Sequence, residues 1–149
     1  MIGCRPIQIV SIGLPVLVVH IASLKVLEKI SVDTLRLSRL LTSLDTDMLY
    51  AFTFQTFDPD ATIHSRAFAP KLGIPEDPAT GSAAGAAGAY LFRNKLISKE
   101  SCEKIIIEQG HMMGRPSSLF VCVEQNKDEI KSVRVGGESV TLIKGEISI

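Results

Sequence analysis

The chain has 149 residues, a length that fits one domain able to bury its own core. Its 16 basic and 16 acidic residues cancel, so the net charge gives no reason to expect a nucleic acid or an anionic membrane as partner. Hydrophobic residues make up 46% of the chain, which argues against disorder. We therefore expect a single domain over residues 1–149 whose partners are small molecules or proteins.

Strands are the first elements expected, at residues 7–12 and 16–21. The apolar stretch 7–24 superficially resembles a signal peptide or a membrane span, but polar residues, a glycine and a proline interrupt it. Two helices follow, with Ser23 and Asp33 as N-caps and leucines at three- to four-residue spacing in the second. Residues 48–54 and 62–68 then have the β-branched and aromatic composition of strands.

A glycine- and proline-bearing loop over residues 70–81 is expected to be irregular, and it leads into a run of small residues. That run predicts a helix from about Ser82 to Asn94. Gly85 and Gly88 each cost about 1 kcal/mol against alanine inside a helix, so we expect the backbone of a curved sheet to approach closely there. Four strands are predicted after the helix, at 104–108, 119–125, 130–135 and 139–143, with Gly136-Gly137 as a hairpin turn.

Strands before and after one helix, without regular alternation, predict an α+β domain. Three cysteines, Cys4, Cys102 and Cys122, are widely spaced and form neither a CxxC pair nor a zinc-binding cluster. Such a pattern suits a reduced, cytoplasmic protein. The three histidines are scattered and indicate no metal site.

The candidate binding motif begins at Asp77-Pro78 and continues through the start of the small-residue helix. Free backbone amides at a helix start, together with the helix dipole, favour an anion. Thr80, Gly81, Ser82 and Ala83 are the candidate substrate-binding residues of this turn. The alternative is a capped helix after a proline turn, in which the hydroxyl groups only satisfy backbone amides.

Glu76 and Asp77 are neighbours, so in an extended segment their side chains point to opposite sides and need not form a catalytic pair. Asp77 is the stronger catalytic candidate, because Pro78 restricts the backbone that aims it. Glu76 remains a possible site residue. A second loop, residues 109–117, brings Arg115, which could bind a carboxylate, or could be a solvated surface residue.

The segment Arg66-Ala-Phe-Ala-Pro-Lys-Leu-Gly-Ile-Pro-Glu-Asp-Pro-Ala-Thr-Gly-Ser-Ala resembles the central motif in the second half of PhzF-like phenazine-biosynthesis proteins. Residues 11–17, 109–117 and 133–140 resemble further segments of that half, in the same order. The resemblance thus covers nearly the whole chain.

This resemblance implies one lobe of the diaminopimelate-epimerase-like fold, with a curved mixed or antiparallel sheet around a central helix. It also implies an isomerase or epimerase that transfers protons by acid/base chemistry, without cofactor or metal, on a small carboxylated metabolite. Asp77 would be an active-site acid, and Gly81 and Ser82 would hold the substrate at the helix start.

The family's proton-shuttling glutamate and its glycine-asparagine-proline motif belong to the first lobe, and neither pattern occurs in this sequence. We therefore expect the chain to need a first lobe from a partner chain. The alternatives are a non-catalytic module that binds ligand or forms a homodimer, and a truncated product. No nucleic acid or membrane partner is expected.

Overall fold

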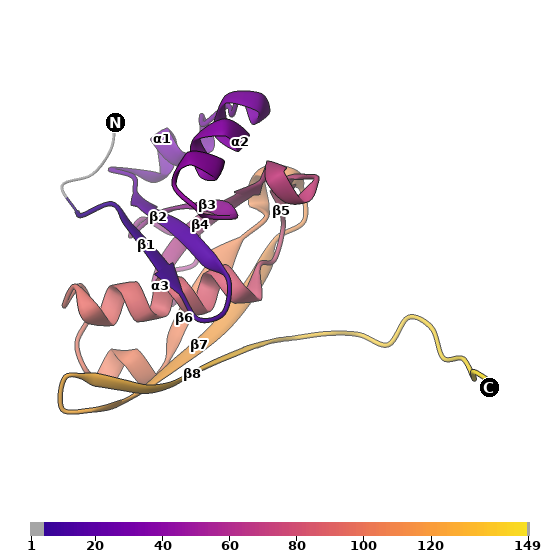
Figure 1. The fold of residues 1–149 in the computed structure, drawn as a ribbon. Coiled ribbons are helices and arrows are strands. Elements are labelled where there is room, and N and C mark those ends of the chain that lie inside the picture. The colour runs from indigo at the N-terminus through magenta and orange to yellow at the C-terminus, as the bar shows by residue number, and fades with distance from the viewer. Residues whose placement is uncertain (1–4, 149) are drawn as a thin grey trace.

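Helix α3 (Gly81–Arg93) lies at the centre of the molecule, and one curved sheet wraps around it (Figure 1). The computed structural model describes residues 5–148. Ten consecutive residues of α3, from Ala83 to Phe92, are buried. The arrangement is the α+β fold that the sequence predicts, and the helix begins one residue before the predicted Ser82 and ends one before Asn94.

The sheet is mixed, and its strands run in the order β1-β2-β3-β4-β6-β7-β8, with β5 also paired to β4. The pairs β2–β3 and β4–β6 are parallel and the others are antiparallel. The strand bounds are β1 Gln8–Ser11, β2 Pro15–His20, β3 Met48–Thr53, β4 Ile63–Ala69, β5 Ile74–Asp77, β6 Ile105–Gln109, β7 Ser117–Asn126 and β8 Glu129–Gly137.

Two short helices, α1 (Leu24–Glu28) and α2 (Thr34–Ser43), cover the outer face of β2, β3 and β4. Both predicted caps are confirmed: Ser23 accepts a hydrogen bond from the Val26 amide, and Asp33 from the Arg36 amide. Apolar side chains of these helices pack with those of the sheet in a second, smaller core. Strands β2, β3 and β4 are thus largely buried on both faces.

The glycines of α3 allow the close approach that was predicted, but side chains of the sheet make it and not the sheet backbone. A Cβ atom at Gly88 would lie 2.7 Å from Val121 Cγ1, and one at Gly85 would overlap Ile12 Cδ1 and lie 3.0 Å from Val135 Cγ2. Real Cβ atoms do not sit so near to other atoms without displacing them. Small residues on α3 therefore allow β1, β7 and β8 to curve tightly around it.

The C-terminal region differs from the prediction. Gly136 and Gly137 make no hairpin turn but continue β8, where they pair with Phe120 and Leu119 of β7. Residues 139–143 form no strand; the chain from 138 onward is extended and leaves the body (Figure 1). The physical reason is the length of β7, which begins at Ser117 and so gives both glycines a pairing partner.

The loop predicted over residues 70–81 also holds regular structure, namely a 3₁₀ turn, η1 (Pro70–Leu72), and strand β5. Strand β6 pairs only with the first half of β4, residues 63–65, so the second half keeps a free edge. Strand β5 occupies that edge, through Ala67 and Ala69. Two further 3₁₀ turns, η2 (Glu100–Glu103) and η3 (His111–Met113), flank β6.

Of the three cysteines, Cys102 and Cys122 are free thiols, and Cys4 lies outside the described residues. Within residues 5–148, the helices are all too short or too polar to cross a membrane.

Candidate active site at the start of the central helix

The candidate site forms where two strands meet end to end on the same edge of β4. Strand β5 runs antiparallel to β4 and ends at Asp77, opposite Ala67. Strand β6 runs parallel to β4 and ends at Gln109, opposite Ser65. The carboxyl ends of β5 and β6 therefore converge, and α3 begins four residues after Asp77.

A chain of hydrogen bonds joins these strand ends to the start of α3. The Thr80 hydroxyl donates to Asp77 Oδ2 over 2.5 Å. Gln109 Nε2 donates to the Asp77 carbonyl oxygen at 2.6 Å and to Thr80 Oγ1 at 2.9 Å. The motif residue Asp77 and the cap residue Thr80 are thus brought together.

Two further buried polar side chains, Tyr50 of β3 and Ser65 of β4, extend this network beyond Gln109. Tyr50 OH donates to Gln109 Oε1 at 3.3 Å, and Ser65 Oγ lies 2.8 Å from the same Tyr50 oxygen. Tyr50, Ser65 and Gln109 have no exposed surface. Burial raises the pKa of Tyr50, which keeps its phenol protonated and able to donate.

The first amides of α3 remain open. Thr80 is the N-cap residue, but its side chain makes no capping hydrogen bond. The backbone N–H groups of Gly81, Ser82 and Ala83 have no hydrogen-bond partner within residues 5–148. Uncapped amides at a helix start, aided by the helix dipole, form a binding point for an anion. Ser82 is exposed beside them, whereas Ala83 is buried.

A cavity of about 610 Å³ adjoins this helix start. Helix α3, the strand β7 and the end of β8 contribute its walls. The lining residues are Ala79, Gly81, Pro116, Ser117, Ser118, Leu119, Val135, Gly136, Gly137 and Glu138. Such a volume falls in the range of small-molecule sites.

Glu76 lies on the other side of β5 from this network. Both of its carboxylate oxygens pair with Arg66, at 2.8 Å each. Neighbouring strand residues point to opposite faces, so Glu76 faces α1 while Asp77 faces α3. In this conformation Glu76 takes part in an ion pair and does not join the Asp77 network.

Arg115 lies in the loop after β6, which packs against the Asp77-Pro78 turn. A Cβ atom at Gly110 would overlap the Arg115 carbonyl oxygen and lie 2.8 Å from that of Pro78. Gly110 has φ +82°, so it meets both the spatial and the conformational demand for glycine. Arg115 itself is exposed, one residue before the cavity wall at Pro116.

The family model for phenazine biosynthesis-like proteins matches residues 3–145 of this chain. The chain belongs to this family. An uncharacterized isomerase of Clostridium acetobutylicum is 39% identical over 142 residues, covering 95% of this chain and 47% of that protein. Trans-2,3-dihydro-3-hydroxyanthranilate isomerase of Pseudomonas chlororaphis is 43% identical over 83 residues, which are 56% of this chain and 29% of that enzyme.

Solved structures of PhzF-family proteins share the fold. A Pseudomonas aeruginosa protein described as a predicted epimerase superposes with a TM-score of 0.67 and 33% identity, over 91% of this chain and 43% of that one. The PhzF-family protein of Bacillus anthracis gives a TM-score of 0.68 at 22% identity, over 85% of this chain and 43% of that one. Some curated relatives match this chain along most of its length. The chain spans about half the length of those relatives.

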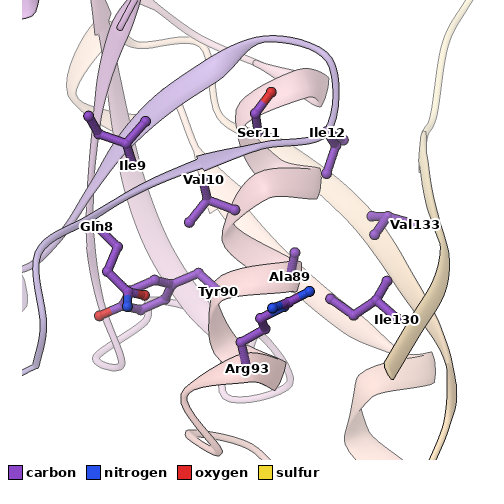
Figure 2. A pocket seen from close by; sticks show the side chains of 10 residues that line it. All are labelled: Gln8, Ile9, Val10, Ser11, Ile12, Ala89, Tyr90, Arg93, Ile130 and Val133. Atoms are coloured by element: carbon purple, nitrogen blue, oxygen red, sulfur yellow. The ribbon is translucent and has the colours of Figure 1, made fainter. Parts of the chain in front are cut away.

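A second cavity of this PhzF-family chain, about 590 Å³, is a groove between the edge strands β1 and β8 (Figure 2). Val10 of β1 points toward α3, and Ile130 and Val133 of β8 face it across the groove (Figure 2). Among the described residues that line the groove, Arg93 is the one with a charged side chain. The groove thus brings no acidic side chain beside this arginine, and the start of α3 remains our candidate site.

Two features of the buried polar region were not selected from the sequence as candidate site residues. One is Gln109, which was noted only as the first residue of a loop. The other is the pair His64–Glu108, with 2.8 Å between His64 Nδ1 and Glu108 Oε2. Polar residues at the end of the apolar run Ile105-Ile-Ile-Glu-Gln were the available signal, because a buried strand carries glutamate and glutamine only where partners exist.

Burial lowers the pKa of His64, although the hydrogen bond to Glu108 opposes the shift. Burial alone would raise the pKa of Glu108, but hydrogen bonds from His64 and from the Phe57 and Asp58 amides outweigh it and lower that pKa. The pair therefore consists of a neutral imidazole and a carboxylate near neutral pH. It holds the loop before β4 to the end of β6.

Proposed function

We propose that this chain is one lobe of an isomerase or epimerase that moves a proton between two positions of a small carboxylated metabolite. The observation that carries the proposal is Asp77, aligned by Thr80 beside open helix amides in a chain of the PhzF family. Members named as isomerases are similar along most of this chain. No net electron transfer is involved, because a proton removed from carbon is returned to a different carbon in an isomerisation, or to the opposite face of the same carbon in an epimerisation.

Each part of the proposed site has a separate task. The amides of Gly81, Ser82 and Ala83 bind the carboxylate of the metabolite, since the helix start favours negative charge. Asp77 lies next to that carboxylate and relays the proton or holds the reacting part of the molecule. Arg115, exposed in the adjoining loop, is available to a carboxylate that enters the cavity.

The second proton-transferring group comes, in our proposal, from a first lobe on a partner chain. The support is that the matched part of the Clostridium acetobutylicum relative is 47% of its length, so the rest of such a protein offers a second lobe that can face the start of α3. The cavity at the helix start is open, so a partner surface can complete it. The chemistry proceeds with acid and base side chains alone, without a cofactor.

Deuterium exchange tests this proposal. The chain is mixed with the part of the Clostridium acetobutylicum relative that it does not match, and trans-2,3-dihydro-3-hydroxyanthranilate is added in deuterated water. We expect deuterium at a ring carbon only when both proteins are present. Absence of exchange with this compound and with a panel of related carboxylic acids would remove the support for catalysis.

A second candidate is a homodimeric, non-catalytic module, which the exposed C-terminal segment favours. Val140, Leu142, Ile143 and Ile147 are each at least 80% exposed. Apolar groups so exposed can drive association. Sizing of the purified chain distinguishes the candidates: a tight homodimer that excludes the first-lobe protein supports the module, and a monomer that binds it supports the isomerase lobe.

A further inference from the structure

The amide of Gln109 has only one orientation that satisfies its neighbours. Its nitrogen lies 2.6 Å from the Asp77 carbonyl oxygen, which can only accept. Its oxygen lies 3.4 Å from the Thr80 backbone nitrogen and 3.3 Å from Tyr50 OH, and the backbone nitrogen can only donate. Flipping the amide would set donor against donor and acceptor against acceptor. Two backbone groups therefore fix which end of the side chain meets Thr80.

This orientation determines the direction of the Thr80 hydroxyl. Gln109 Nε2 donates to Thr80 Oγ1 over 2.9 Å, so the hydroxyl accepts from that side. Its single proton then points to Asp77 Oδ2. A threonine at an N-cap position ordinarily turns its oxygen toward the amide two or three residues ahead. In this chain the Thr80 oxygen instead accepts a hydrogen bond from Gln109 and caps no helix amide.

We propose that Gln109 is a positioning residue that turns the Thr80 hydroxyl away from the helix start, so that the amides of Ser82 and Ala83 stay free for ligand. The inference rests on the proposed function insofar as those amides bind the substrate. It concerns a residue that touches neither ligand nor reacting atoms. Gln109 acts through Thr80. Its hydrogen bond to Thr80 Oγ1 directs the hydroxyl proton toward Asp77 Oδ2, and this second hydrogen bond aligns the Asp77 side chain.

Burial makes this arrangement firm. Gln109 has no exposed surface and Thr80 is 7% exposed, so water does not compete for their hydrogen bonds. All four hydrogen-bonding positions of the Gln109 amide are used, two by nitrogen and two by oxygen. Ser65 and Tyr50 hold the far end and are buried as well.

Amide hydrogen exchange tests the inference without any ligand. In the wild-type chain we expect the amide of Ser82, an exposed residue, to exchange at nearly the rate of an uncapped helix end. In Gln109→Met, Thr80 becomes free to cap, and exchange at Ser82 or Ala83 should slow by roughly fivefold, the strength of an ordinary N-cap. The double variant Gln109→Met with Thr80→Val removes the capping oxygen and should restore fast exchange.

Each outcome of that experiment decides the matter. Slow exchange at the exposed Ser82 in the wild type overturns the inference, and this measurement does not depend on whether any variant folds. Slow exchange that persists in the double variant also overturns the inference. Without the Thr80 oxygen the slowing cannot come from capping, so Gln109 would have a merely structural role. Gln125→Met, a half-buried glutamine of β7 near the β7–β8 turn, is the matched control and should leave these amides unchanged.

Ligand binding then separates this inference from the proposed function. Anthranilate is titrated into each variant while the amide resonances of residues 81–83 are followed. We expect affinity to fall about fivefold in Gln109→Met, as capping competes, and to recover in the double variant. If wild type binds no anthranilate but shows the exchange pattern above, the positioning role stands and the proposed ligand is wrong. If anthranilate binds equally in all variants, the positioning role is wrong.

Discussion

Arg66 and Glu76 form a bidentate ion pair, with both nitrogen–oxygen distances at 2.8 Å, on the face of β5 opposite the Asp77 network. The remaining nitrogen of Arg66 reaches the carbonyl oxygens of Leu27, Glu28 and Ile30 at the end of α1. One guanidinium thus fastens β4, β5 and α1 together. The side chains of the pair are 8% and 18% exposed, so solvent screens them little.

Removal of this guanidinium should destabilise the fold strongly. Arg66→Met leaves Glu76 unpaired and removes the donor of the Glu28 and Ile30 carbonyl groups, and we expect a loss of about 3 kcal/mol in the free energy of unfolding. Urea denaturation followed by circular dichroism measures it. Arg36→Met, at an exposed pair with Asp33, is the control and should change stability by less than about 0.5 kcal/mol. Equal effects of the two variants would contradict this assignment.

Asp77 and Glu76 should respond differently to loss of charge. Asp77→Asn is expected to lower deuterium exchange, measured with the first-lobe protein present, by roughly a hundredfold or more, with little change in stability. Glu76→Gln should keep most of the exchange activity and instead lose about 1–2 kcal/mol of stability, because its role is the Arg66 pair. The reverse pattern would assign the chemistry to Glu76.

Glycine at position 88 should be required for packing. Gly88→Ala gains about 1 kcal/mol in helix propensity, but its Cβ meets Val121 and Val123, whose branched side chains cannot yield easily. We expect a net loss of about 1–2 kcal/mol, measured by urea denaturation. Gly81→Ala is the matched control in the same helix, because within residues 5–148 its Cβ would have one neighbour, Val135 Cγ1, at an ordinary 3.8 Å. A stabilising Gly88→Ala would show that the sheet is looser than described.

Acid should destabilise the fold in two steps through His64 and Glu108. The pKa of His64 is lowered in the folded state, so below its ordinary value of 6.5 the unfolded chain binds more protons and stability falls with pH. The pKa of Glu108 is also lowered from 4.5, and its contribution is lost at still lower pH. A ¹³C-detected titration of the His64 ring should give a midpoint below 6.5, and a midpoint above it would contradict the described burial.

The C-terminal segment should add nothing to the stability of the body. Residues 138–148 are exposed throughout and form no strand. We expect a chain that ends at Gly137 to have the melting temperature of the full chain, and limited proteolysis to cut first within 138–148. A fall of several degrees on truncation would mean that the segment packs on the domain.

The elements with strong local patterns were predictable from sequence. The small residues of α3, the caps Ser23 and Asp33 and the apolar strands each carry their signal within a few neighbouring residues. The segment 139–143 has strand composition but gains no partner, and Gly136-Gly137 stays in a strand only because β7 is long enough to pair with it. Strand pairing of this kind depends on distant residues, which no local pattern reveals.

The same limit applies to the candidate site. Asp77 and the turn at Thr80 could be selected from sequence, because they are adjacent and precede a helix. The role of Gln109 could not, since it follows from the registers of two strands on β4. Glu76 can pair with Arg66 only because strand β5 lies beside β4. Although Glu76 is next to Asp77 in the sequence, its side chain therefore faces a different part of the fold.

The end-to-end meeting of β5 and β6 on β4 also sets an order of assembly. Strand β5 follows β4 after a single 3₁₀ turn, so this antiparallel pair closes only a short loop, and the Asp77 end is placed early. Strand β6 joins β4 in parallel only after the chain has passed through α3, a long-range contact that folds slowly. We therefore expect Gln109 to arrive after the Asp77 end is in place. Until β6 has joined β4, Thr80 and Asp77 lack their hydrogen bonds to Gln109, so the complete site requires this long-range pairing.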